Sequence, residues 1–326
     1  MKTTISIVTP CFNEASNIEE LTIRIRSVME ALPDYDYEHL LIDNNSQDDT
    51  VERIKGLATN DARIRLIVNC RNFGHIRSPT HALFQAQGDA IIILASDLQD
   101  PPELIEKFVK KWEAGFKIVI GVKPKSEETV LMFLFRRLYY RTIGRISEVP
   151  LIENFTGFGL YDREVVEMLR SLNDPYPYFR GLIAELGYPR AEIPFEQPRR
   201  VRGVTKNNFY TLYDLAMLGI TSHSKIPLRL ATMSGFLLSF ISLLIAFGYG
   251  VAKFIFWDSF TLGMAPLVIG LFFFGSVQLF FIGLLGEYIG AIHTHVMKRP
   301  LVVEKERVNF DLSHSNSIMN SGVREK

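Results

Sequence analysis

Several features that would assign this chain to a familiar class are scarce or missing. Its 326 residues contain two cysteines, Cys11 and Cys70, which are too few for a disulfide framework and suit a reducing compartment. Lysine plus arginine and aspartate plus glutamate both number 36, so no excess charge favours nucleic acid as a partner. The first ten residues carry no apolar core, so we expect no secretory signal there.

Motifs of common nucleotide and metal sites are also missing. No GxGxxG follows the first predicted strand, no GxxxxGK[ST] occurs, and the GFGLYD stretch at Gly157 lacks the last glycine. The chain has no zinc-ligand spacing either. These absences argue against a dinucleotide fold, a P-loop enzyme and a zinc site.

Two long uncharged runs lie in the C-terminal third. Leu230 to Ala252 is 23 residues long and Ser259 to Gly286 is 28 residues long. Because roughly 20 apolar residues cross a bilayer, we expect transmembrane helices over 229–257 and 261–292. The alternative, two buried helices of a soluble protein, is disfavoured by the length of the runs.

Basic residues flank these runs on their outer sides: Lys206, Lys225, Arg229, Lys298 and Arg299. The positive-inside rule therefore predicts an inner (cytoplasmic) membrane protein with both termini cytoplasmic, including a tail over 293–326. Residues 206–228 precede the first run, and their apolar side chains recur at helical spacing. This pattern predicts an amphipathic helix in the membrane interface, or alternatively an ordinary core-facing helix.

Residues 1–205 are predicted to form a cytosolic α/β catalytic domain. Short apolar runs alternate with helical patterns, which predicts a doubly wound, mainly parallel sheet. The expected strands are TISIV, ending at Pro10, then HLLID, RIRLIV, AIIIL and KIVIGV. Ser16 and Glu19 form a capping-box pattern, and another helix is expected over 78–87. Asp162 is expected to have a structural role at a helix start, and a role in sugar binding is the alternative.

Polar clusters follow three of these strands: PCFNE, DNNSQDD and SDLQD. In open α/β sheets ligands bind outside the carboxyl ends of the strands. The three clusters are therefore expected to converge on one site.

Eight motifs in order resemble the family 2 glycosyltransferases that act on polyisoprenyl phosphates: VTPCFNEASNIEEL, DNNSQDDT, RNFG, DLQDPPE, LYDREVV, YFRGL, RGVTK and GLLGEYIGAI…KRP. The likeness is greatest to bactoprenol glucosyltransferases and dolichol-phosphate mannose synthases, and it runs from about Ile5 to Pro300. It implies a GT-A fold, a nucleotide-sugar donor, a divalent metal (Mg²⁺ or Mn²⁺) and inversion at the sugar carbon.

The resemblance and the residue chemistry together suggest which residues bind the nucleotide. The candidates are Pro10, Phe12, Glu14, Asp43 and Asn44. Phe12 offers a flat apolar contact for the base, whereas Glu14 with Asp43 or Asn44 offers hydrogen bonds. Relatives usually carry Asp at the position of Asn44, which leaves the identity of the base open. Asp48 and Asp49 are interpreted as a capped helix start.

Asp97 and Gln99 match the positions that hold the metal in this family. Oxygen ligands suit Mg²⁺ and Mn²⁺, and a cation is needed between a carboxylate and a diphosphate. Where relatives have a further Asp, this chain has Ala95, so a more hydrated metal site is expected. Asp97 could alternatively cap a helix instead of binding a metal. For Asp100 we prefer the interpretation as a helix cap.

Cations are needed to bring the donor diphosphate and the lipid phosphate together. The phosphate-binding candidates are Arg136, Arg137, Arg180, Arg200, Arg202 and Lys206. The catalytic set is expected to be Asp97, Arg200, Arg202 and Lys206. The alternative is that the basic run binds anionic lipid headgroups. The lipid phosphate has a second pKa near 6, so it needs no strong general base.

The leading hypothesis is transfer of a hexose, with glucose the best guess, from a UDP-sugar to undecaprenyl phosphate. One alternative is a GDP-mannose-dependent mannosyltransferase acting on a polyprenyl or dolichyl phosphate. Another is a non-catalytic, membrane-tethered nucleotide-sugar binder, motivated by Ala95 and by Gly157, where many relatives carry Asp. Gly286 and Gly290 suggest close helix packing within the hairpin or in a homo-oligomer.

Overall fold

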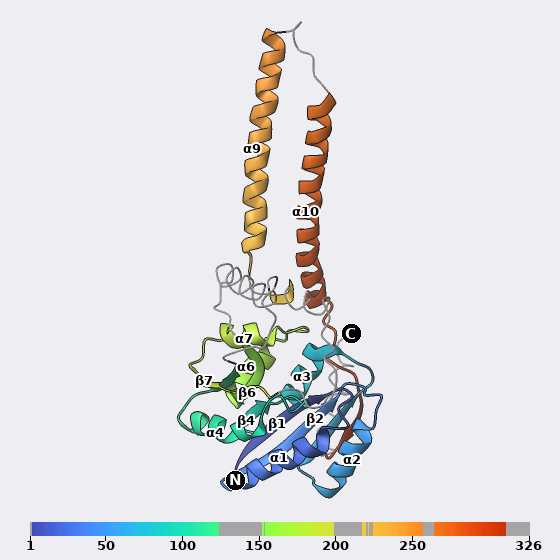
Figure 1. Ribbon diagram of the computed structural model, residues 1–326, viewed down its shortest axis with the longest axis vertical. Helices are drawn as coiled ribbons and strands as arrows, with labels where there is room; N and C mark the ends of the chain where they lie inside the picture. The colour runs from blue at the N-terminus through green and yellow to red at the C-terminus, as the bar shows by residue number, and fades with distance from the viewer. Residues whose placement is uncertain are drawn as a thin grey trace, which may run out of the picture. The chain divides into compact units, whose positions relative to one another are not determined.

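The computed structural model describes residues 2–123, 152, 154–198, 217–219, 221, 224–256 and 264–310 (Figure 1). The chain divides into two compact units. Unit 1 comprises residues 1–136, 150–207 and 298–326, and unit 2 comprises residues 137–149 and 208–297. The sheet belongs to unit 1, and the two long apolar helices belong to unit 2.

Unit 1 is built on a mixed sheet with the strand order β7-β5-β6-β4-β1-β2-β3-β8. In chain order the strands are Thr3–Cys11, Tyr35–Asp43, Ile64–Asn69, Ala90–Ile93, Ile118–Val122, Phe155–Asp162, Arg190–Pro194 and Glu304–Val308. β1 pairs in parallel with β2 and β4, β2 with β3, and β5 with β7. β6 and β8 run antiparallel to their neighbours. The predicted α/β class with a mainly parallel sheet is confirmed.

Helices pack on both faces of this sheet. They are α1 (Ile18–Glu30), α2 (Thr50–Asn60), α3 (Gly74–Gln85), a 3₁₀ turn η1 (Pro102–Leu104), α4 (Ile105–Glu113), α6 (Arg163–Ser171) and α7 (Phe179–Glu185). Successive strand residues point to opposite faces. Ile7 therefore joins the apolar cluster under α1 and α4, whereas Val8 joins the one under α3 and α6 (Figure 1). Burial of each such side chain contributes about 2 kcal/mol.

Three local predictions were wrong in detail. β1 continues through Pro10 to Cys11, although proline leaves one ladder hydrogen bond unmade. α1 takes Asn17 as its N-cap residue, one position after the expected Ser16, and the Asn17 side chain makes no cap hydrogen bond. α3 begins at Gly74, before the expected start, and carries Pro79 inside it.

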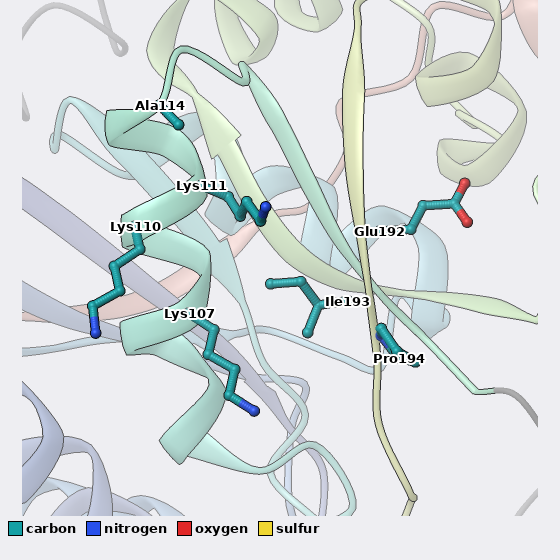
Figure 2. A pocket seen from close by; sticks show the side chains of 7 residues that line it. All are labelled: Lys107, Lys110, Lys111, Ala114, Glu192, Ile193 and Pro194. Carbon is teal, nitrogen blue, oxygen red and sulfur yellow. The ribbon is translucent and has the colours of Figure 1, made fainter.

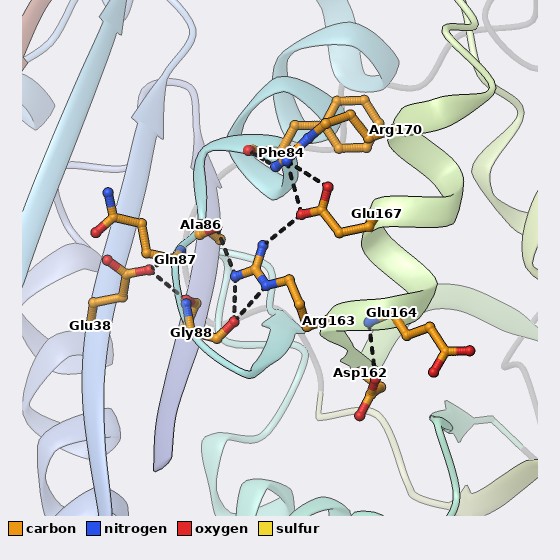
Figure 3. Close-up of polar contacts among 11 residues, drawn as sticks. Glu38, Phe84, Ala86, Gln87, Gly88, Asp162, Arg163, Glu164, Glu167 and Arg170 are labelled. Atoms are coloured by element: carbon orange, nitrogen blue, oxygen red, sulfur yellow. Dashed lines mark hydrogen bonds and ion pairs between the residues drawn. The ribbon is translucent and has the colours of Figure 1, made fainter. Parts of the chain in front are cut away.

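The turn between α3 and β4 is held from two sides (Figure 3). Arg163 donates to the carbonyl oxygens of Ala86 and Gly88, both at 2.9 Å, and Glu38 accepts from the backbone N of the residue between them at 2.6 Å. A Cβ at Gly88 would lie 2.7 Å from the backbone of β1, so only glycine fits there. This clamp fixes where β4 enters the sheet.

Asp162 serves the fold, as its position at a helix start predicted. Its carboxylate accepts from the backbone N of Glu164 at 2.9 Å, which caps α6, and from the Trp112 indole at 2.8 Å. Asp162 pairs with Ala90 at the amino end of β4. It therefore lies at the edge of the sheet opposite the polar clusters.

Unit 2 contains α9 (Ile226–Ile255) and α10 (Met264–Val296), which agree with the predicted spans to within a few residues. Both are long and apolar enough to cross a membrane. Their large side chains are exposed: Phe236 is 74% exposed and Phe272 is 70% exposed. Side chains of this kind on an exposed helix surface require an apolar surrounding.

The tail after α10 provides a strand that the sequence did not predict. β8 pairs antiparallel with the edge strand β3. Glu304 accepts hydrogen bonds from His81 of α3 at 2.5 Å and from Arg307 at 2.6 Å. Although burial alone would raise the pKa of Glu304, these two partners lower it from 4.5 to about 2. The charged strand EKERV thus covers an edge that would otherwise be open to pairing with another chain.

Neutralising Glu304 is expected to loosen β8. Because the pKa is lower in the folded state, the stabilisation is present above pH 4.5 and is lost as the pH falls from 4.5 towards 2. We expect Glu304→Gln to lower the local stability of β8 by about 1–2 kcal/mol at pH 7. Amide hydrogen exchange of residues 304–308 measures this loss. Glu306→Gln is the matched control, since Glu306 makes a more exposed ion pair with Lys55. Equal protection of β8 in both variants would contradict the role given to Glu304.

Candidate active site

The carboxyl ends of β1, β2, β4 and β5 lie along one edge of the sheet. β1 is parallel to β2 and β4, and β5 has the same direction as β4 because both run antiparallel to β6. The segments leaving these ends are 12–17, 44–49, 94–100 and the residue Lys123. The three predicted polar clusters therefore do share one edge.

The first two loops are joined by hydrogen bonds. Asn13 N donates to Ser46 Oγ at 2.8 Å, and Gln47 N donates to the side-chain oxygen of Asn13 at 2.7 Å. Glu14 N donates to Thr50 Oγ1 at 2.9 Å. Asn13 has a φ of 57°, a left-handed conformation that asparagine tolerates. The two loops thus form one preorganised surface.

Asp43 lies beneath this surface. It is fully buried at the end of β2, and its carboxylate accepts from the backbone N of Ser46 at 2.9 Å and from Ser46 Oγ at 2.5 Å. Burial raises the pKa of Asp43, and the hydrogen bonds from Ser46 oppose that rise. Asp43 is therefore held in one orientation from within its own loop.

The side chain of Asn44 makes hydrogen bonds to the segment 69–74. Its Nδ2 donates to Asn72 Oδ1 at 2.9 Å and to the Gly74 carbonyl at 3.2 Å. Its Oδ1 accepts from Phe73 N at 2.8 Å and from Asn69 Nδ2 at 3.2 Å. The amide of Asn44, which is 8% exposed, is thus fully used in holding the RNFG loop. This commitment could not be read from the sequence, because the loop lies 25–30 residues away.

The remaining nucleotide candidates lie on or beside the same surface. Pro10 pairs with Ile42 within the sheet, and Phe12 and Glu14 are partly buried in the loop that leaves β1. The Glu14 carboxylate accepts from Asn17 Nδ2 at 2.7 Å. Phe12, Glu14 and Asp43 therefore come from two adjoining strand ends.

Cys11 connects this surface to the third cluster. Burial and the nearby carboxylates of Asp43 and Glu14 raise the pKa of its thiol well above the usual value, and a hydrogen bond with Ser96 opposes the rise. β1 and β4 pair up to Val8 and Ile93, and Leu94 N donates to the Val8 carbonyl at 3.0 Å. Phe12 and Asp97 therefore follow two adjacent strand ends.

Residues 94–100 form a tight loop around Asp97. Asp97 Oδ1 accepts from Gln99 N at 3.1 Å, and Leu98 between them has a φ of 61°. Such a conformation is unfavourable for leucine and is found at functional sites more often than elsewhere. Asp97 is only partly buried. The Gln99 amide donates towards the Pro198 carbonyl at 3.5 Å.

Asp100 is not a helix cap, contrary to our expectation. Its Oδ2 accepts from the backbone N of Ala95 at 3.2 Å, which closes the loop, and η1 has no side-chain cap. Burial raises the pKa of Asp100 to about 6, and the neighbouring charge of Asp97 adds to the rise. Two carboxylates thus lie close together at the end of β4.

Lys123 is a site residue that the sequence analysis missed. It follows β5 directly, and its Nζ donates to Gln197 Oε1 at 2.7 Å. Burial lowers the pKa of Lys123, and the charges of Asp100, Arg180 and Asp97 all act on it. Arg180, a predicted phosphate ligand at the start of α7, is thus near enough for its charge to act on Lys123. A single lysine after a strand has no motif that would mark it.

Five predicted phosphate-binding residues lie outside the described residues: Arg136, Arg137, Arg200, Arg202 and Lys206. Their role remains a prediction. The described cations of the site are Lys123 and Arg180.

The described oxygen groups of this site could hold a divalent metal only together with oxygen atoms of a bound diphosphate. Within the described ranges no group of three His, Cys, Asp or Glu residues has the arrangement of a metal site. Asp97 supplies a carboxylate and Gln99 an amide oxygen, both of which suit Mg²⁺ or Mn²⁺. A diphosphate and water would have to complete the coordination shell. With that contribution, Asp97 and Gln99 fit a Mg²⁺ or Mn²⁺ ion.

Gly157 cannot be replaced by an acid without a change of backbone. Its φ is 104°, which L-residues rarely adopt, and its carbonyl accepts from the Tyr161 hydroxyl at 2.8 Å. The Asp that many relatives carry at this position would be strained here. The local backbone is built for glycine.

A separate groove of about 440 Å³ lies between α4 and β7 (Figure 2). It is lined by Lys107, Lys110, Lys111, Ala114, Glu192, Ile193 and Pro194. Ile193 faces α4, whereas Glu192 points to the other side of β7 (Figure 2). None of the predicted site residues is among the residues that line this groove.

Removing the Asn44 amide is expected to destabilise unit 1. Asn44→Ala removes four hydrogen bonds, two of which join Asn44 to the buried residues Asn69 and Phe73, and their loss costs about 2–4 kcal/mol. Thermal unfolding of the full chain in detergent measures the loss. Asn60→Ala is the matched control, because Asn60 makes one exposed hydrogen bond at the end of α2. A melting temperature equal to that of the control would contradict the anchoring role.

Known proteins resemble this chain over most of its length. An uncharacterized glycosyltransferase of Synechocystis sp. is 34% identical over 303 residues, covering 91% of this chain and 93% of its own. The SfII prophage-derived bactoprenol glucosyl transferase of Shigella flexneri is also 34% identical, covering 93% of this chain and 97% of its own. Among solved structures, a mannosyltransferase of Pyrobaculum calidifontis in complex with GDP-Man and Mn²⁺ is 16% identical and covers 91% of this chain and 88% of that chain, with a TM-score of 0.46.

The sequence model of one family matches residues 6–170, which include most of β1, all of β2 to β6 and all the described site residues except Arg180. The relatives extend the match through both apolar helices. From this match and from the shared strand edge described above, the chain is a member of glycosyl transferase family 2.

Proposed function

We propose that this protein transfers a hexose from a nucleoside diphosphate sugar to a polyisoprenyl phosphate at the cytoplasmic face of a membrane. The observation that carries the proposal is the 34% identity to a bactoprenol glucosyl transferase over 93% of this chain, which includes both the site and the apolar helices. Glucose from UDP-glucose is the donor we favour. Undecaprenyl phosphate is the acceptor we favour.

The charges of the site suit a reaction between two anions. Asp97 and Asp100 lie among the cations Lys123 and Arg180. Asp97 and Gln99 would hold a divalent metal, which when bound neutralises charge on the diphosphate. Lys123 and Arg180 would bind phosphate oxygens and reduce the repulsion between donor and acceptor. Arg200, Arg202 and Lys206 are proposed to serve the acceptor phosphate.

The nucleophile needs no general base from this chain. A phosphate monoester is largely dianionic at neutral pH because its second pKa is about 6. The site residues would therefore orient the reactants and stabilise the leaving diphosphate. This reading is consistent with Gly157, since no acid stands at that position.

Base recognition is assigned to Phe12, Glu14 and Asp43. Asn44 is committed to the RNFG loop, so the difference from relatives at that position does not by itself distinguish uridine from guanosine. A GDP-mannose donor therefore stays as the second candidate. We place both termini on the cytoplasmic side, from the basic flanks of the apolar helices.

Incubation of the purified full-length protein with undecaprenyl phosphate, Mn²⁺ and radiolabelled nucleotide sugar tests the function. We expect a labelled lipid from UDP-glucose. A labelled lipid only from GDP-mannose would support the second candidate. If no donor gave labelled lipid while nucleotide sugar still bound, the protein would be a binder and the proposal would fail.

Loss of the Asp97 charge is expected to abolish most of the turnover. Asp97→Asn should lower kcat/KM by at least about 10²-fold, because the metal contributes several kcal/mol. Titration of Mn²⁺ in the presence of UDP should show weaker binding of the ion. Asp36→Asn, at the opposite edge of the sheet, is the control. Unchanged Mn²⁺ affinity in Asp97→Asn would refute the metal assignment.

The role of Lys123 can be tested against Lys117, the lysine at the other end of β5. Lys117 and Lys123 lie directly before and after β5, so only Lys123 is at the site edge. We expect Lys123→Ala to lower kcat/KM by about 10²-fold and Lys117→Ala to leave it unchanged. Lys123→Arg should recover part of the loss. Equal rates for the two alanine variants would exclude Lys123 from the reaction.

A further inference from the structure

Three arginines from distant parts of the sequence gather on unit 1. Arg71 follows β3, Arg77 lies in α3, and Arg299 follows α10. Arg77 donates a hydrogen bond to the Pro300 carbonyl, which brings the residue after Arg299 to α3. The guanidinium carbons of Arg71 and Arg77 lie 4.1 Å and 5.4 Å from the centre of the Phe73 ring.

None of these three arginines forms an ion pair with a carboxylate in the part of the chain that the structure describes. Arg71 donates only to the Asn72 carbonyl at 3.1 Å. The Nε of Arg77 is buried and has no hydrogen-bond partner among the described atoms. Most other described arginines of unit 1 are paired with acids: Arg24, Arg26, Arg53, Arg63, Arg65, Arg163, Arg170, Arg190 and Arg307.

The three charges also act on one another. Burial lowers the pKa of Arg77, and the positive charges of Arg71 and Arg299 lower it further, against an opposing effect of Tyr176. Like charges held together without a carboxylate are costly unless an anion binds between them. Guanidinium groups bind phosphate oxygens through paired N–H donors.

The position of Arg299 in the sequence, just after α10, indicates that the phosphate group bound by these arginines belongs to a membrane phospholipid. It lies three residues after the last residue of α10, and Lys298 stands beside it. Basic residues at such a position meet the phosphates of anionic phospholipids at the cytoplasmic surface. The choice of a phospholipid phosphate rests on insertion of α10 into the membrane, and it does not depend on sugar transfer.

We propose that Arg71, Arg77 and Arg299 form a binding site for the headgroup phosphate of an anionic phospholipid, separate from the site of the reaction. Phe73, with two guanidinium groups over its ring, fixes their spacing. The same RNFG loop supplies the partners of Asn44. The site thus joins a membrane headgroup to the loop that supports the nucleotide surface.

Native mass spectrometry of the detergent-purified full chain tests this site without any assay of sugar transfer. The probes are phosphatidylglycerol, phosphatidylcholine, inorganic phosphate and undecaprenyl phosphate. We expect wild type to retain phosphatidylglycerol over phosphatidylcholine. Since each arginine near an anionic lipid contributes about fivefold, the variant with R71Q, R77Q and R299Q should bind phosphatidylglycerol about 10²-fold more weakly.

Two further variants guard against loss of folding. Arg71→Gln changes an exposed side chain and should weaken phosphatidylglycerol binding about fivefold with an unchanged melting temperature. Arg53→Gln, which removes an exposed arginine paired with Glu19, should bind like wild type.

Three results would overturn the proposal. The first is equal retention of phosphatidylglycerol by wild type and the triple variant. The second is displacement of the lipid by inorganic phosphate at equal concentration, which would indicate a site for free phosphate. The third is selective displacement by undecaprenyl phosphate, which would make the three arginines part of the acceptor site.

Discussion

The parallel pairing of β1 with β2 and β4 is the constraint on which the candidate active site depends. It brings three polar segments to one edge of the sheet, although they are separated by tens of residues in sequence. Hydrogen bonds then fix each segment before any ligand arrives, as between Asn13 and Ser46 and between Ala95 and Asp100. Because these groups are already oriented, a bound ligand pays little to organise the site.

Opposite charges meet along this edge. Burial raises the pKa of Asp100, and the charge of Asp97 adds to the cost of keeping both carboxylates ionised. Lys123 and Arg180 offset part of that cost. Under the proposed function, a site of this composition would bind a cation and a diphosphate together, because either one alone would leave charge uncompensated. That property connects the geometry to glycosyl transfer onto a phosphate.

Sequence patterns predict the sheet and the two apolar helices, because hydrophobic periodicity and run length report directly on burial. Interactions between segments that are distant in sequence are harder to predict from the sequence. The role of Asn44 depends on a loop that the chain reaches only after another helix and strand. β8 has a charged sequence and becomes a strand only because β3 offers an open edge. Asp100 resembles a helix cap in sequence, yet its carboxylate turns back to Ala95.

Anomalous X-ray diffraction from Mn²⁺, in crystals of the full chain grown with UDP, tests most directly whether Asp97 is the meeting point of cation and diphosphate. We expect a manganese peak about 2.1–2.3 Å from a carboxylate oxygen of Asp97, with diphosphate oxygens bound between the ion and Lys123. A manganese ion bound to UDP but remote from Asp97, for example beside Asp43, would contradict the central claim.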